Sequence, residues 1–270
     1  MDFSYDPVTA LDEASATGPT AELFADIRAT MQIPLVTSIW RGLAGMDDSL
    51  AAVWAPTRPI YAGTDPAVEL KRVVDAARLP IPAPLAPTQL ACLGVTHDDL
   101  TAIRAIVGAY NRSNGMNLVT LAALLSETSN AAAASHRVSP VPAWTDFPAL
   151  LPQPEIAAGT WDLVRHVNAF GAPGLDANVA TLWRHLAHWP ALLAIIHSGF
   201  APLHASGAID AATAEIVELA RDAGVRMAHL RGDTSGISDA ARSTITGYVR
   251  TPTQVVRMVT LGHALERWLR

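Results

Sequence analysis

The stretch Ala180–His197, "ATLWRHLAHWPALLAIIH", places two tryptophans, three histidines and an arginine within an otherwise apolar run. Its segment "WRHLA" (183–187) echoes "WRGLA" (40–44) in the first half of the chain. The same offset, without gaps, also pairs Pro59 with Pro202. Because tryptophan is rare, an ordered set of matches that includes it indicates an internal repeat.

Two further matches follow in the same order along the chain. "YNR" (110–112) matches "YVR" (248–250), and "LVTL" (118–121) matches "MVTL" (258–261). We therefore predict two homologous helical halves around a pseudo-twofold axis, each completing the core of the other. The Pro-rich stretch between them is typical of a linker. The predicted units are an N-terminal helical repeat (1–138), a Pro-rich linker (139–159) and a C-terminal helical repeat (160–270).

Helical signals dominate the rest of the sequence. The segment 64–80 opens with Thr-Asp-Pro, a favourable helix start, and 96–110 carries two aspartates in its first turn with an apolar stripe behind them. The segment 210–224 begins at an aspartate and ends at Gly224, where a left-handed residue after a helix is expected. No run of period-two alternation is convincing. We therefore predict an all-α fold.

The opening stretch itself is best explained as core. At helical spacing, Trp183, Leu186 and Ile196 share one apolar face, and Pro190 either kinks the helix or starts a second one. His185 and His188 are three residues apart, which a metal pair would allow, but no HExxH motif or nearby carboxylate cluster supplies a third ligand. We predict surface or interface histidines and no metal site.

Composition excludes several classes of function. The chain has 270 residues, of which 50% are hydrophobic and 16% charged, and this balance is typical of a globular protein. A net charge of −6 and the absence of Lys/Arg runs disfavour a nucleic-acid partner. The apolar stretches are shorter than the roughly 20 residues that span a bilayer, which disfavours a membrane protein.

Motifs for secretion, redox chemistry and cofactor binding are also missing. The polar, acidic start "MDFSYDPVTALDE" differs from a secretory signal, and the single cysteine, Cys92, excludes an internal disulfide and any CxxC site. Neither GxGxxG nor GxxxxGK[ST] occurs, so nothing indicates a phosphate-bearing cofactor. We expect a cytoplasmic protein without a cofactor.

The segment "AYNRSNGMNLVTLAALLSE" (109–127) is the most informative polar region. Asn111, Asn114 and Asn117 cluster beside Tyr110 where a helix should break or restart. Asparagine is unfavourable within a helix but can both donate and accept hydrogen bonds in a polar pocket. A turn at Asn114-Gly115 and a polar binding site both remain open from the sequence.

These segments resemble the group I 2-haloacid dehalogenases, which accept both D and L substrates. "FADIRATMQIPLVTSIWRGLA" (24–44) is similar to that family's N-terminal pattern, and "YNRSNGMNLVTLAALLSE" (110–127) to its Asn-bearing segment. "LWRHLAHWPALL" (182–193) resembles its Leu-Ala-x-Trp-Pro segment, and "GYVR" (247–250) more loosely its C-terminal Tyr region. The resemblance covers nearly the whole chain, through short motifs in matching order.

The resemblance implies an alkylhydroperoxidase D-like pseudo-dimer of two helical repeats, with a pocket between them for a small or medium organic acid. In that family an Asp, helped by an Asn, activates a water that displaces halide without a covalent intermediate. Carried over by position, Asn114 matches the catalytic Asn, and the substrate-binding positions fall on Leu35, Ser38, Thr181, Leu182 and Tyr248.

The same carry-over exposes a departure from the family. Leu182 stands where the catalytic Asp is expected, and leucine cannot accept a proton. Asp176, which follows Pro173, is the alternative base if the preceding loop slips toward the site. Three hypotheses follow: a hydrolytic dehalogenase using Asp176, an enzyme of altered chemistry in the same pocket, or a non-catalytic binding or assembly protein. The expected partner is a small organic acid, and a homo-oligomer is possible.

Overall fold

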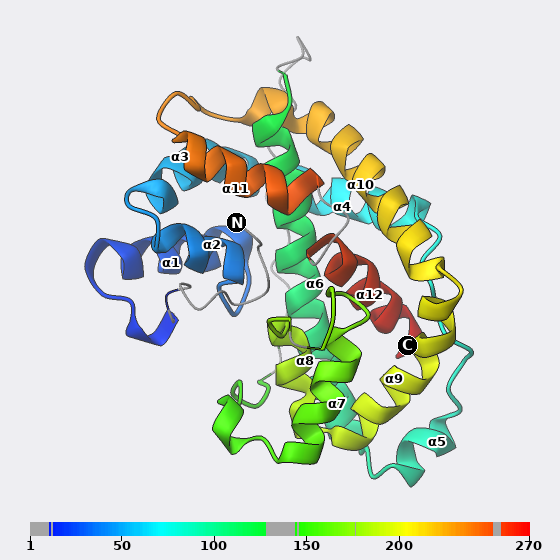
Figure 1. Cartoon of the computed structure of the whole chain (residues 1–270). Helices are drawn as coiled ribbons and strands as arrows, with labels where there is room; N and C mark the ends of the chain where they lie inside the picture. The colour runs from blue at the N-terminus through cyan, green and yellow to red at the C-terminus, as the bar shows by residue number, and fades with distance from the viewer. Residues whose placement is uncertain (1–10, 12, 128–143, 145, 176, 251–254) are drawn as a thin grey trace.

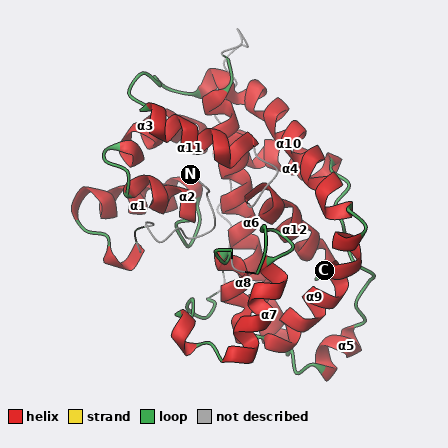
Figure 2. Ribbon diagram, viewed as in Figure 1, coloured by secondary structure: helices red, strands yellow, loops and turns green. Residues whose placement is uncertain are grey.

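The computed structural model describes residues 11, 13–127, 144, 146–175, 177–250 and 255–270, and every regular element in these ranges is helical (Figures 1 and 2). The prediction of an all-α fold is therefore confirmed. The elements are η1 (Glu13–Ser15), α1 (Gly18–Met31), α2 (Ser38–Ala44), α3 (Ser49–Tyr61), α4 (Asp65–Ala76), α5 (Pro87–Cys92), α6 (His97–Leu125), η2 (Gln153–Glu155), α7 (Ala158–Asn168), α8 (Thr181–His185), η3 (Leu186–His188), α9 (Pro190–Ala205), α10 (Ala208–Met227), η4 (Ala228–Leu230), α11 (Asp239–Arg250) and α12 (Val255–Trp268).

The 29-residue helix α6 runs through the centre of the molecule, and the other helices pack around it (Figure 1). It contacts α3, α4, α8, α10, η4, α11 and α12. Its start is fixed by a capping box, in which the Thr96 side chain accepts from the Asp99 N–H and the Asp99 carboxylate accepts from the Thr96 N–H. Helices from the N-terminal and the C-terminal parts of the chain therefore pack against α6.

α6 continues through the asparagine cluster, so the helix break and the turn considered at Asn114-Gly115 are wrong. Gly115 serves close packing instead, since a Cβ there would lie 2.5 Å from a methyl carbon of Leu70 on α4. Asn117 is fully buried and its amide group is hydrogen-bonded to other helices. Tertiary contacts thus outweigh the low helix propensity of this segment.

A second glycine has the same role. We expected Gly224 to end the helix of 210–224, but α10 runs from Ala208 to Met227 and Gly224 lies within it. A Cβ at Gly224 would lie 2.6 Å from the backbone carbon of Ala122 on α6. The glycine is therefore required by the close crossing of α10 and α6 rather than by a helix end.

The opening stretch folds as two α-helices, α8 and α9, with the short 3-10 helix η3 between them. α8 and η3 end before Trp189, and Pro190 is the first residue of α9, where a proline fits without loss of a hydrogen bond. Trp183 is 1% exposed, and Trp40 in α2 is fully buried. Both tryptophans are thus core residues, as expected, while the repeat and its three-part division of the chain remain predictions.

The described part of the Pro-rich segment packs against the rest of the molecule. The Trp144 indole donates to the Gln32 carbonyl, and the Pro148 carbonyl lies 2.6 Å from Nε2 of His185. His185 is only 3% exposed, so its predicted place at the surface is wrong; Tyr110 and Phe147 cover its ring.

None of the helices in the described ranges combines the length and the apolar composition that a membrane-spanning segment needs. The stretches Pro190–Ala205 and Ala208–Leu230 meet that criterion only together, as a pair bent by 81°.

Candidate functional site

Four of the predicted site residues line one small cavity, which we call the Asn114 cavity. Ser38 and Thr181 are the first residues of α2 and α8, Asn114 lies midway along α6, and Leu182 follows Thr181. Its volume is about 10 Å³, which is about the space that one water molecule needs. The remaining lining residues are Thr37, Tyr110, Ala180, Val255 and Met258.

A buried hydrogen-bond network stiffens the wall next to Asn114. Asn117 Oδ1 accepts from the Trp40 indole (3.2 Å) and the Tyr61 hydroxyl (2.8 Å), and Asn117 Nδ2 donates to Thr37 Oγ1 (3.0 Å). Thr37 Oγ1 lies 3.1 Å from Ser113 Oγ. Networks of this kind fix side-chain positions when their members are satisfied. The wall has little freedom to open for a larger ligand.

Asn114 itself stands outside this network. Its amide makes no hydrogen bond to any described residue, and the side chain is only partly buried. An amide can donate and accept at the same time. Asn114 is therefore, with Ser38 and Thr181, a polar group that this cavity offers to a water or a ligand.

The opposite wall is positioned by Asn168, the last residue of α7. Its Oδ1 accepts from the Ala180 N–H (2.9 Å), and its Nδ2 donates to the Asn178 carbonyl (3.1 Å). These two bonds hold the segment that enters α8 and so place Thr181. Sequence reasoning missed Asn168; its only signal was a polar residue at a helix end.

A larger cavity, which we call the Arg41 cavity, adjoins the first one. Its volume is about 240 Å³, and Tyr110 and Thr181 line both cavities. Leu35, the remaining predicted wall position, lies here and not in the Asn114 cavity. The other lining residues are Glu13, Val36, Arg41, Phe147, Pro148, Ala149, Leu150 and His185.

Arg41 and Glu13 supply opposite charges to this larger cavity. Arg41 is 8% exposed, and a buried guanidinium among apolar side chains is suited to hold a carboxylate. Glu13 accepts from the Val36 N–H (2.9 Å) and forms an ion pair with Arg28. Glu13 is the one carboxylate among the described residues that line the two cavities, and it is already engaged.

Tyr110 and His185 form a pair between the cavities. The Tyr110 hydroxyl lies 3.3 Å from His185 Nδ1, and His185 Nε2 lies 2.6 Å from the Pro148 carbonyl. Because a carbonyl can only accept, Nε2 carries the proton and Nδ1 accepts from Tyr110. Burial lowers the pKa of His185, and the bond to Pro148 opposes that shift only in part. His185 is a neutral ring with both nitrogens occupied.

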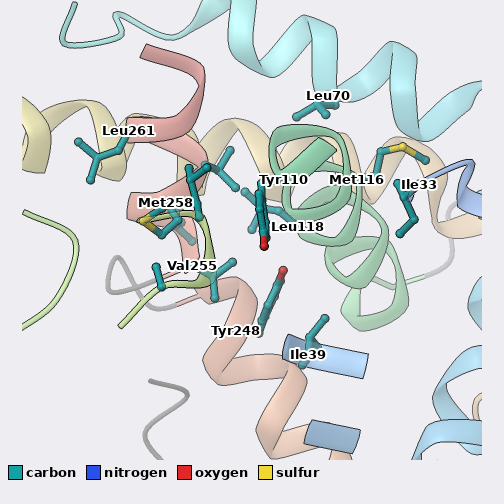
Figure 3. Close-up of a cluster of buried hydrophobic side chains, with 14 of the residues drawn as sticks. Ile33, Ile39, Leu70, Tyr110, Met116, Leu118, Tyr248, Val255, Met258 and Leu261 are labelled. Carbon is teal, nitrogen blue, oxygen red and sulfur yellow. The ribbon is translucent and has the colours of Figure 1, made fainter. Parts of the chain in front are cut away.

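Tyr248 lies outside the lining of both cavities. It is 2% exposed, and its hydroxyl and that of Tyr110 point toward one another between α11 and α6 (Figure 3). Burial raises the pKa of Tyr248, so the phenol is neutral. Asp176 lies outside the described residues; its neighbour Leu175 is 39% exposed, and the Leu175 carbonyl accepts from Arg165 on α7.

Metal binding finds no support near either cavity. His188 is occupied with the Ala149 carbonyl (2.8 Å from Nε2). Across the described ranges, no group of three or more His, Cys, Asp or Glu side chains is arranged to hold a metal ion.

Sequence comparison identifies no relative, because no protein-family model and no curated protein matches the chain. Structural comparison finds solved structures with a similar fold. Two solved structures, described as a D-2-haloacid dehalogenase mutant and as D-2-haloacid dehalogenase in complex with L-LA, each have a TM-score of 0.77 at 15% identity. A complex of a mutant with D-2-CPA has a TM-score of 0.75 at 14% identity. In each case the match covers 100% of this chain and 98% of the other. The chain therefore has a haloacid-dehalogenase-like fold, as the sequence motifs predicted.

Proposed function

We propose that the protein binds a small organic acid across the two adjoining cavities, without hydrolysing a carbon–halogen bond there. The observation that carries the proposal is the meeting of Asn114, Thr181 and Leu182 in one cavity that shares two lining residues with the Arg41 cavity. Arg41 would hold the carboxylate through charge-assisted hydrogen bonds. The apolar residues around Arg41 would cover the carbon chain, and Asn114 would contact a polar substituent.

Among the described residues that line the two cavities, no group is free to act as a base, and this supports binding rather than hydrolysis. Activation of water needs a proton acceptor within hydrogen-bond distance, and its loss costs roughly 10²–10⁴-fold in rate. Leu182 lies in the wall beside Asn114, and Glu13 is engaged by Arg28 and the Val36 N–H. His185 already donates from one nitrogen and accepts at the other. None of these described groups is left to deprotonate a water.

Calorimetric titration with 2-chloropropionate and lactate tests the binding. We expect both acids to bind, and Arg41→Gln to weaken binding about ten- to a hundredfold, as the loss of a charged hydrogen bond implies. Arg184→Gln is the matched control, because Arg184 follows Trp183 as Arg41 follows Trp40 and lines neither cavity. Equal affinity in the wild type and Arg41→Gln would contradict the proposal.

Halide release separates binding from hydrolysis. We expect none from D- or L-2-chloropropionate with the wild type. Leu182→Asp should create a trace of release that disappears when Asn114→Ala is added. If instead the wild type releases halide and Asp176→Asn abolishes this without unfolding the protein, Asp176 is the base and the protein is a hydrolytic dehalogenase.

A further inference from the structure

A third cavity, distinct from the two above, lies between α4, α6 and α12. Its volume is about 420 Å³, which is larger than either cavity of the candidate site and within the usual range of roughly 300–1,000 Å³ for small-molecule sites. We call it the His263 cavity. Its lining residues are Ala67, Leu70, Lys71, Val74, Asp75, Gly108, Asn111, Arg112, His263, Glu266, Arg267 and Arg270.

The lining of this cavity carries an excess of positive charge. Four of its side chains are cationic and two are carboxylates, whereas the whole chain has a net charge of −6. Asp75 is shared by Lys71 and Arg267, and Glu266 pairs with Arg270. Positive charge concentrated in a concave surface of an acidic protein favours an anionic ligand.

Arg112 is the cation without a carboxylate partner among the described residues. Its Nε donates to the Met31 carbonyl (3.1 Å) and its Nη2 to Gln32 Oε1 (3.4 Å), which leaves Nη1 without a described partner. Burial lowers the pKa of Arg112, although a guanidinium remains charged at neutral pH. An anion in the cavity would supply the missing counter-charge.

His263 gives the inner wall a fixed acceptor. The ring is 8% exposed, and its Nδ1 lies 3.4 Å from Glu266 Oε2, which also accepts from Asn111 Nδ2 (2.8 Å). A carboxylate facing Nδ1 favours the proton on that nitrogen and leaves Nε2 as an acceptor. Nε2 is buried and has no hydrogen-bond partner within the described ranges. A buried acceptor without a donor costs free energy, which a ligand with an O–H or N–H group would recover.

The remaining wall is apolar. Ala67, Leu70 and Val74 lie on one side of α4, and Gly108 on α6 adds no side chain to the wall. Such a wall suits the carbon skeleton of a ligand rather than a bare inorganic ion.

We propose that the His263 cavity is a second binding site, for a small organic anion that has an apolar body and one hydrogen-bond donor. Arg112 and Arg267 receive the anionic group, α4 covers the apolar body, and His263 Nε2 accepts from the donor. Neither the fold nor the proposed function of the Asn114 and Arg41 cavities requires this site.

Titration with 4-hydroxyphenylacetate, followed by calorimetry and by NMR of ring-labelled histidine, tests the proposal. We expect binding that shifts the His263 ring signals, assigned with His263→Gln, and leaves those of His185 in place. Phenylacetate lacks the hydroxyl donor and 4-hydroxybenzyl alcohol lacks the charge, so each should bind at least about tenfold more weakly. Arg112→Gln should weaken binding by a similar factor, and Arg112→Lys should recover part of it.

Several results would overturn the proposal. If inorganic phosphate binds as tightly as 4-hydroxyphenylacetate, the site recognises negative charge alone and neither the apolar body nor the hydrogen-bond donor. An absence of binding at millimolar ligand would exclude the site. Binding that is lost in Arg41→Gln but kept in Arg112→Gln would place the ligand in the Arg41 cavity, and this result would leave the proposed function intact.

Discussion

The Asn114 cavity and the His263 cavity lie along the same two helices, α6 and α12, yet they differ in size and chemistry. The first is lined by Val255 and Met258 at the start of α12 and holds about 10 Å³. The second is lined by His263 and Glu266 near the end of α12 and holds about 420 Å³. The residues carried over from the haloacid dehalogenase motifs thus line a cavity that is almost filled, while the larger His263 cavity draws on these motifs only through Asn111 and Arg112.

The difference teaches that a fold can bring motif residues together without leaving room for a ligand among them. Leu182 is 2% exposed, and its side chain fills space beside Asn114. The Asn117 network holds one wall of the Asn114 cavity in place, whereas the His263 cavity retains a buried acceptor and an excess of cations. The following predictions test whether the first region is rigid and the second adaptable.

The largest effect is expected from the core that supports the Asn114 cavity. Trp40→Ala and Trp183→Ala should each lower the free energy of unfolding by about 3–5 kcal/mol, because each leaves a cavity in a fully packed site. Substitution by phenylalanine should distinguish Trp40 from Trp183. Trp40 donates to Asn117, whereas the Trp183 indole N–H has no partner in the described part of the chain. Trp40→Phe should therefore cost more than Trp183→Phe in urea denaturation, and equal costs would show that the Asn117 network adds no rigidity.

A smaller effect is expected from the carboxylate of the His263 cavity. The contact with the His263 ring, then the hydrogen bond from Asn111, lowers the pKa of Glu266 from its usual 4.5 to about 2. Glu266→Gln should cost about 1–3 kcal/mol at neutral pH.

Unfolding measurements at a series of acidic pH values test the sign of the contribution that Glu266 makes to stability. Because the pKa of Glu266 is lower in the folded chain than in the unfolded chain, its stabilisation is complete above about pH 4.5 and is lost as the pH falls toward 2. The wild type should lose stability faster than Glu266→Gln in that range. Glu218→Gln, at an exposed position on α10, is the control and should change stability by less than about 0.5 kcal/mol. Parallel pH profiles of the wild type and Glu266→Gln would contradict the assignment.

The smallest effect is expected at Gly262 on α12. This glycine faces Asn111, whose amide donates a hydrogen bond to Glu266. A Cβ at Gly262 on α12 would overlap Oδ1 of Asn111 and displace the amide that donates to Glu266. Gly262→Ala should destabilise by about 1 kcal/mol, since the gain in helix propensity offsets part of the clash. Gly247→Ala on α11 meets nothing within 4 Å and should stabilise by about 0.5–1 kcal/mol. A stabilising Gly262→Ala would show that Asn111 is free to move.

The helical class was predictable because helical periodicity, a local pattern, marked α4, α6 and α10. The resemblance to the haloacid dehalogenases, and not a local pattern, supplied four of the nine residues that line the Asn114 cavity, namely Ser38, Asn114, Thr181 and Leu182. The continuity of α6 was not predictable, because Gly115 and Asn117 are explained only by Leu70 and Trp40 from distant helices. The same holds for the His263 cavity, which assembles side chains from α4, α6 and α12 that share no local spacing.

The buried course of α6 has a consequence for how the chain folds. Its middle turn, Ser113-Asn114-Gly115, has low intrinsic helicity, so the helix is weak until other segments pack against it. Those segments range from Trp40 to α12, and closing such long loops makes folding slow relative to helical bundles with local contacts. We therefore expect α6 to become a continuous helix late in folding, when α10 and α12 dock against it.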